Sequence, residues 1–276
     1  MRPKISVPFV VFNGGELGLE TLSRVTLENY AATSEIQENV WVDVNGPMGL
    51  RPGLGFCADL GTPAYRIHRF VRSVAERFLL VLGDETLRVA FDGDVLARPS
   101  VTSTVTDGAL TSLAGWTDIS TGAATATIVS GRLALNSNGL DTAGIRQAVT
   151  TSSAGTLHAL EIFVHHGSVK FKCGSSSGGQ QYIEERELRT GHHSLAFTPS
   201  GTYYVEFTST AYMQVEVESI QVASSGDLVL DTPWASADLQ SLRFHQTLNV
   251  MYVALGTTQQ RRIERWDNNS WSVTKT

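Results

Sequence analysis

Histidine, cysteine and glutamate side chains gather in the middle of the chain, and these side chains can bind transition metals. The candidates are His165, His166, His192, His193, Cys173, Glu184, Glu185 and Glu187. Adjacent residues on a strand point to opposite faces of the sheet, so each histidine pair can give only one ligand to a site. Because no metal-ligand spacing recurs, we interpret these residues as solvated strand ends and loop positions. The sequence predicts no metal site.

Two glycine-rich stretches, residues 14–16 and 49–55, are candidates for a phosphate-binding loop. Such a loop opens a helix and ends in Lys and Ser or Thr, and neither stretch has these residues. We interpret both as tight turns. A nucleophile–base arrangement is also missing, since the chain has no cysteine in a catalytic setting. We predict no enzyme and no bound cofactor.

Aromatic side chains are the remaining candidates for a binding site, because flat rings can stack on the apolar face of a sugar. The candidate glycan contacts are Trp116, Tyr182, Tyr204 and Tyr212. The alternation from Tyr203 to Phe207 predicts that Tyr204 faces outward. Trp116 lies at the first strand of the middle part. Burial of its ring in the core is the alternative to a role in glycan binding. Tyr182 and Tyr212 lie beside turns, which favours exposure.

The charge of the chain is −6, and residues 101–225 carry six Lys or Arg against ten Asp or Glu. A protein that grips DNA without sequence preference needs clustered cations, because its affinity comes from phosphate contacts. The only adjacent basic pair is Arg261 and Arg262. An acidic surface would repel DNA and let it slide past. No stretch approaches the roughly 20 apolar residues of a membrane span.

Short apolar runs rich in Val, Ile, Phe and Tyr alternate with turn residues along the chain, which is typical of β-strands. The predicted strands include residues 39–44, 65–71, 77–82, 86–91, 132–136, 145–149, 157–164, 168–173, 193–198, 202–209, 213–222, 247–255 and 261–266. The turn from Gly83 to Glu85 predicts a hairpin of Arg77–Leu82 with Thr86–Phe91. Short helical segments are expected within Gly18–Tyr30 and at Thr33–Glu38, and a short capped turn or helix is expected at Ala235–Leu242.

Composition divides the chain into an outer and a middle part. From about Pro99 to Gly155 the sequence is dominated by Ser, Thr, Ala and Gly, and charges are sparse. After Gly226 the composition returns to that of the N-terminal part. We therefore predict an all-β protein with a discontinuous domain, residues 1–104 and 226–276, and an inserted jelly-roll β-sandwich, residues 105–225.

Several segments outside the middle part resemble one protein family when taken in order. They include Phe12–Leu17, Arg24–Tyr30, Glu38–Val40, Gly49–Gly53, Arg66–Phe70, Phe78–Gly83, Asp231–Leu239, Ser241–Gln246, Asn249–Val253 and Arg262–Trp266. This set is similar to the tail nozzle (tail tubular) proteins of podovirus-type bacteriophages. The resemblance covers about residues 8–98 and 226–276, and it implies that the outer domain is a partial β-propeller-like body.

The resemblance also implies a function and partners. It implies a virion structural protein, made in the host cytoplasm, that forms a ring with copies of itself in the tail. Its partners would be the adaptor, neighbouring nozzle subunits and fibres, and DNA would pass through the channel without being specifically bound. The residues that we expect to contact neighbours are Arg24, Glu28, Tyr30, Arg51 and Arg88. Local salt bridges worth under ~1 kcal/mol each are the alternative role of these charges.

The middle part resembles the jelly rolls of carbohydrate-binding modules. The residues that carry this likeness are Gly115–Thr117, Arg146–Val149, Leu188–Gly191 and Gly201–Phe207. This resemblance implies an alternative function, an adhesin that recognises a host surface glycan through the insertion. A tail hydrolase is a third alternative.

Overall fold

Strands make up nearly all of the regular structure of this protein, so the predicted all-β class is confirmed. The computed structural model describes residues 11–18, 20–21, 26, 30–45, 47–51, 53, 55–61 and 65–276. The chain divides into two units, Met1–Phe56 and Cys57–Thr276. No helix in the described part of the chain has the length and apolar character that a membrane crossing requires.

The first unit has little regular structure. It contains the 3-10 helix η1 (Tyr30–Ala32) and the antiparallel strands β1 (Val40–Val42) and β2 (Met48–Leu50). Glu16 and Ser34 form a parallel bridge, and the Gly14 N–H donates to the Ala32 carbonyl at 2.7 Å. Residues 33–38 contain no helix, so that prediction is wrong, because this segment pairs with residues 14–17 instead. The predicted helix at Gly18–Tyr30 falls largely outside the described residues.

The second unit contains the remaining strands and the 3-10 helix η2 (Leu239–Ser241). The strands are β3 (Arg66–Val71), β4 (Arg77–Gly83), β5 (Thr86–Phe91), β6 (Asp94–Val95), β7 (Ala97–Arg98), β8 (Thr117–Asp118), β9 (Thr125–Val129), β10 (Arg132–Asn136), β11 (Ala143–Val149), β12 (His158–Gly174), β13 (Ile183–Phe197), β14 (Tyr203–Ser209), β15 (Val215–Val222), β16 (Gly226–Asp227), β17 (Val229–Asp231), β18 (Arg243–Thr247), β19 (Val250–Leu255), β20 (Thr258–Asp267) and β21 (Ser270–Lys275). The predicted hairpin is confirmed as β4 paired with β5.

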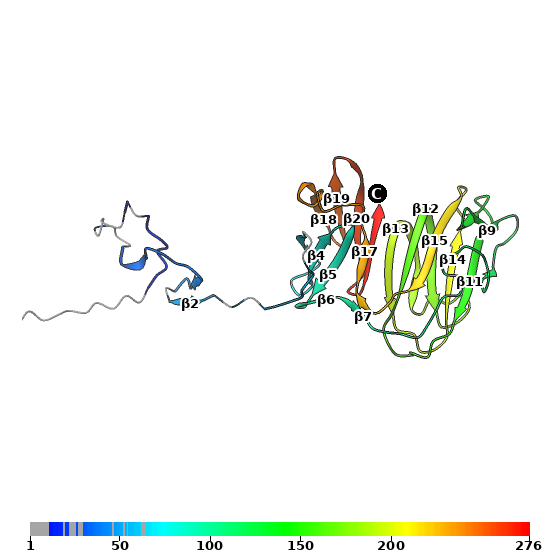
Figure 1. The fold of residues 1–276 in the computed structure, drawn as a ribbon, viewed down its shortest axis with the longest axis horizontal. Coiled ribbons are helices and arrows are strands. Elements are labelled where there is room, and N and C mark those ends of the chain that lie inside the picture. Colours follow the sequence, from blue (N-terminus) through cyan, green and yellow to red (C-terminus); the bar gives the residue numbers. More distant parts are fainter. Residues whose placement is uncertain are drawn as a thin grey trace, which may run out of the picture. The chain divides into compact units, whose positions relative to one another are not determined.

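The long hairpin of β12 and β13 organises the middle of the chain, as Figure 1 shows. The first half of β12 pairs with β15, and its second half pairs with β14. Gly167 lies at the change between the two partners, where the register shifts, and its φ of 76° suits glycine. The sequence predicts two strands here, but the structure has one bent strand that belongs to two layers.

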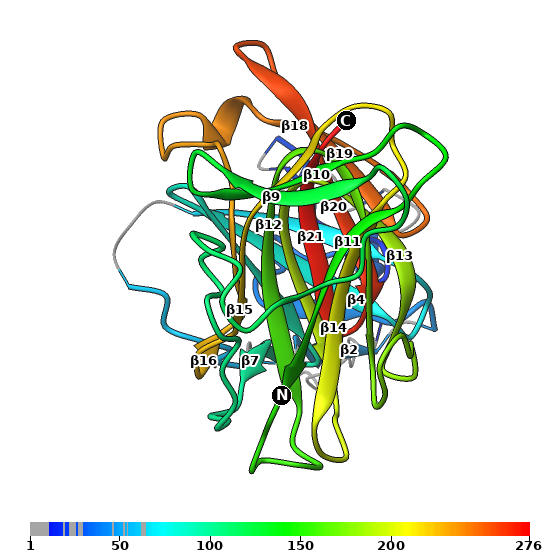
Figure 2. The ribbon, with the colours of Figure 1, turned by 90° about the vertical axis from the view of Figure 1, so that its right-hand side faces the viewer.

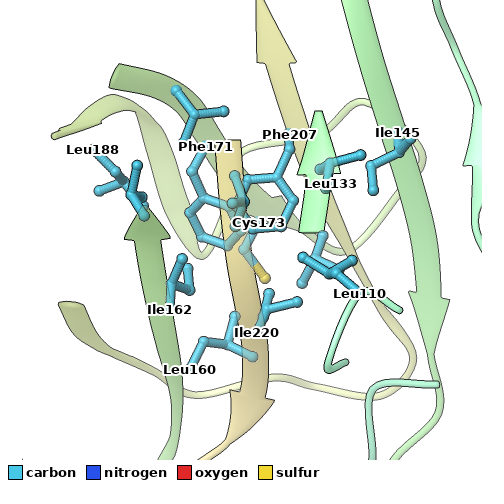
Figure 3. Packing of buried hydrophobic residues seen from close by; sticks show 14 of the residues in the cluster. Leu110, Leu133, Ile145, Leu160, Ile162, Phe171, Cys173, Leu188, Phe207 and Ile220 are labelled. Carbon is cyan, nitrogen blue, oxygen red and sulfur yellow. The ribbon is translucent and has the colours of Figure 1, made fainter. Parts of the chain in front are cut away.

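A first hydrophobic core lies between these two layers. Alternate residues point inward on either side of the bend, such as Leu160 and Ile162 before it and Phe171 and Cys173 after it. Figure 3 shows these side chains meeting Phe207 from β14. The core residues come from within 105–220, so the middle of the chain has a core of its own. Its jelly-roll topology stays a prediction.

A second hydrophobic core lies between the sheet β17-β5-β4-β3 and the strands β18 to β21. Its centre is aromatic: the Trp271 ring meets the rings of Phe70 and Phe78 edge-on, with centroids 5.0 Å and 5.2 Å away. Trp234 is fully buried in the same core. Residues before Arg98 and after Asp227 therefore share one core.

The two cores are joined in two ways. The short strands β7 and β16 pair at the junctions, with Arg98 opposite Gly226. In addition, β21 pairs with β13, so that one hydrogen-bonded sheet runs from β18 into the middle part of the chain. In Figure 1 the C-terminal strand β21, in red, stands next to β13, and Figure 2 shows the same strands turned by 90°. The predicted domain division and the propeller-like character stay predictions.

Candidate functional site

The structure places the four predicted glycan contacts in different settings. Trp116 is 8% exposed and packs in the first core near Phe207, so its ring is not offered to a ligand. Tyr182 is partly buried against the same core, and its hydroxyl forms a 2.8 Å hydrogen bond with Ser200. Tyr204 is partly exposed, on the face of β14 opposite the buried Tyr203 and Val205, as the alternation predicts. Tyr212 is 85% exposed in the loop before β15.

The residues predicted to contact neighbouring subunits are also dispersed. Arg24 and Glu28 lie outside the described residues. Tyr30 begins η1, where its carbonyl accepts a 2.7 Å hydrogen bond from the Thr33 hydroxyl. Arg51 is exposed after β2. Arg88 donates to Asp227 at 3.2 Å, which is the local salt bridge expected as its alternative role.

The side chains considered as metal ligands are separated by the sheets. Cys173 is buried in the first core, where burial raises the pKa of its thiol (Figure 3). His193 is fully buried and its two ring nitrogens bond to Ser272 and to the Arg189 carbonyl, each at 2.8 Å. Glu185 pairs with Lys170 and Lys172. Among the described residues, no three His, Cys, Asp or Glu side chains gather as a metal-binding group.

A charged cluster lies on the outer face of the layer that contains β14. The Glu206 carboxylate accepts from Arg146 Nε at 2.7 Å and lies 2.9 Å from Lys172 Nζ. These residues are opposite one another in the register of β11, β14 and β12. Glu206 is 5% exposed, so its charge is compensated within the cluster. The cluster ties three strands together and offers no free charge from these groups to a ligand.

A cavity of about 340 Å³ lies where residues 231–233, at the end of β17, meet the large sheet. In the large sheet, the cavity is lined from β12, β13, β20 and β21. Its lining residues are Phe163, His165, Thr190, Gly191, His192, Asp231, Thr232, Pro233, Arg261, Val273 and Lys275. A second hollow of about 580 Å³ shares Phe163, His192 and Asp231 with it and is rimmed by Glu161, Glu218 and Gln221. This size range suits a small ligand.

His192 connects the two hollows and is held as a neutral imidazole. Its Nδ1 accepts a 2.9 Å hydrogen bond from the Asp231 backbone N–H, so the ring proton is on Nε2. Burial lowers the pKa of His192, although the carboxylates of Asp231 and Glu161 act in the opposite direction. The Asp231 carboxylate lies 3.5 Å from Nδ1. This arrangement can donate one hydrogen bond from Nε2 to a ligand.

The cavity brings His165 and His192, which were considered as metal ligands, together with residues that the sequence did not single out as a site. Asp231 was recognised only as part of a family-like segment, and Arg261 only as part of a basic pair. Lys275 lies on β21, which the sequence analysis did not predict as a strand. The register of β20 with β21 places Arg261 opposite Lys275, and no local sequence pattern reveals this register. The chain matches no protein-family model, no curated protein and no solved structure.

Proposed function

We propose that this protein is a structural subunit of the tail nozzle of a short-tailed bacteriophage, with no catalytic role. In this proposal copies of the chain surround the tail axis and leave a channel for the genome. Heterologous contacts that close around a rotation axis would form the ring. The net charge of −6 suits a channel wall along which DNA slides.

One observation carries the proposal. The segments that resemble tail nozzle proteins are separated by more than a hundred residues, yet Phe70 and Phe78 from the first set pack on Trp271 beside Ile263 from the second. The residues between them supply a different core. A family-like body with an inserted module would produce this pattern.

The first unit gives further support for a role in an assembly. None of its described residues is buried, and it exposes large apolar side chains. These side chains are Ile36, Trp41, Val44, Leu50 and Phe56. Exposed apolar residues in such number are typical of a segment that packs against another protein. Neighbouring tail proteins would supply that surface.

Recognition of a host glycan is the second candidate function. The observation that favours it is the position of Tyr212, whose ring is largely exposed beside Gly139 in a neighbouring loop. Leu140, in that same loop, is 90% exposed. An exposed aromatic ring of this kind can stack on a sugar. A tail subunit could carry both functions.

Immunogold electron microscopy of particles from the virus that encodes this chain tests the first proposal. Antibodies raised against the purified full chain should label the tail end of the particles, and mass spectrometry of those particles should detect the chain. Antibodies against the major capsid protein serve as the positional control, because they should label the head. Absence of the chain from purified particles, or labelling of the head alone, would contradict the proposal.

A further inference from the structure

Two positive charges lie directly opposite each other on neighbouring strands without a carboxylate partner. Arg261 on β20 is paired in register with Lys275 on β21. Like charges at such positions repel and destabilise a sheet. Neither side chain makes an ion pair or a side-chain hydrogen bond with any residue in the described part of the chain. Both line the cavity of about 340 Å³ beside β17.

Two residues that line the cavity each carry a polar atom that lacks a hydrogen-bond partner. Arg261 Nε and Thr232 Oγ1 are both buried, and neither has a partner among the described residues. Buried polar atoms are normally paired, and an unpaired one costs about 1–3 kcal/mol. Burial also lowers the pKa of Arg261, a sign that its cation is partly withdrawn from water. The protein thus leaves the cations of Arg261 and Lys275 without an acceptor beside the cavity.

The carboxylates near the cavity differ in their partners. His165, which lines the cavity, faces Glu218 at 3.2 Å and Glu216 at 3.9 Å. The Asp231 carboxylate lies 3.5 Å from His192 Nδ1, which already accepts from the Asp231 N–H and has no proton to give, so this carboxylate stays unpaired and is 70% exposed. Among the described residues, Arg261 and Lys275 are the unpaired cations of the cavity lining. The ligand group that suits them is an anion.

The remaining walls indicate what the rest of the ligand is like. Phe163, Pro233 and Val273 give the cavity an apolar side. His192 and Thr190 add polar groups that can exchange hydrogen bonds with hydroxyls. Apolar walls with a few polar groups are the usual lining of a small-molecule site, and the volume is that of a small ring.

We propose that this cavity binds a sugar acid, with its carboxylate held between Arg261 and Lys275 and its ring against Phe163 and Pro233. The carboxylate would offset the repulsion between the two cations by accepting from their terminal N–H groups. The site lies at the meeting of the middle part of the chain with its C-terminal strands and is separate from Tyr212.

Titration calorimetry of the full chain with sodium glucuronate and with N-acetylneuraminate tests the proposal. We expect saturable binding of at least one of these sugar acids and no binding of glucose. Arg261→Gln and Lys275→Gln should each weaken binding about tenfold or more, because each removes a charge-assisted contact. Both variants should fold without loss of thermal stability, since each removes a like-charge repulsion.

The matched control is Arg72→Gln, which removes an exposed charge in the turn after β3 and should leave sugar-acid binding unchanged. Three outcomes would overturn the proposal: no sugar acid binds, glucose binds as tightly as glucuronate, or inorganic phosphate competes as well as glucuronate. Loss of binding in Tyr212→Ala, with Arg261→Gln unaffected, would also overturn it by assigning recognition to the exposed ring.

Discussion

Among single residues, His193 has the most constrained setting of the described histidines. It is fully buried, and both ring nitrogens bond within the protein, to Ser272 and to the Arg189 carbonyl. Its pKa is lowered to about 4, chiefly by burial and in smaller part by the neighbouring His192, while the hydrogen bond to the Arg189 carbonyl acts in the opposite direction. The folded state therefore holds a neutral imidazole well below the ordinary histidine pKa of about 6.5.

This setting predicts that the protein loses stability in mild acid. Between pH 6.5 and pH 4 the unfolded chain takes up a proton at His193 that the folded chain does not. The stabilising contribution is thus complete above about pH 6.5 and falls as the pH approaches 4, by at most about 1.4 kcal/mol per pH unit. Urea unfolding at a series of pH values should show this slope. His192, whose pKa is also lowered by burial, adds to the same trend.

The histidine variants separate this effect from the titration of carboxylates. His193→Gln should flatten the dependence on pH over this interval, whatever its effect on stability at pH 8. His166→Gln, at an exposed position on β12, should leave the slope as it is. An unchanged slope in His193→Gln would contradict the assignment of this titration to His193.

Among elements, β13 depends on one glycine for its place in the sheet. Gly191 lies where β13 leaves the second half of β12 and begins to pair with β21. Its φ is 145°, and a Cβ at this position would lie 2.2 Å from the Val273 carbonyl oxygen. The contact is with backbone, so no side-chain rotation can relieve it.

Gly191→Ala should therefore destabilise the protein by more than about 2 kcal/mol, from backbone strain and overpacking together. Differential scanning calorimetry measures the change. Gly201→Ala is the matched control, because a Cβ there meets nothing within 4 Å, and its thermal midpoint should shift little. Equal midpoints for the two variants would show that the β13–β21 approach can relax more than its geometry suggests.

At the scale of the whole molecule, the chain leaves one core and returns to it through a pair of short strands. Arg98 on β7 and Gly226 on β16 are opposite each other, so a short linker can join the two ends. The second core uses only residues from Phe70 to Phe91 and from Leu228 to Val273, apart from the partly buried Leu96. On the face of β21 that points away from that core, the buried side chains Ser272 and Thr274 are polar.

We predict that a shortened chain, with a Gly-Ser linker in place of residues 101–223, still folds around the second core. It should keep the near-ultraviolet circular dichroism of its buried tryptophans and a cooperative thermal transition. Its midpoint should be lower than that of the full chain, because β21 loses its pairing with β13 and becomes an edge strand. A broad transition with strong binding of a hydrophobic dye would contradict the prediction.

Local sequence patterns were sufficient for the fold class and for many strands. Alternation along Tyr203 to Phe207 predicted which side chains enter the core, and the turn at Gly83 to Glu85 predicted the hairpin of β4 with β5. Both depend on residues within a few positions of each other, which is the range that side-chain periodicity reports. The all-β class follows from many such signals added together.

Tertiary structure alone decided which strands are neighbours and therefore where a ligand can bind. β21 pairs with β13, some 80 residues away in the chain, and this pairing buries His193 against Ser272. The register of β20 with β21 sets Arg261 opposite Lys275, and the turn after β17 then encloses them with Phe163. No periodicity within a strand specifies its partner, because pairing depends on how the whole sheet buries its apolar faces.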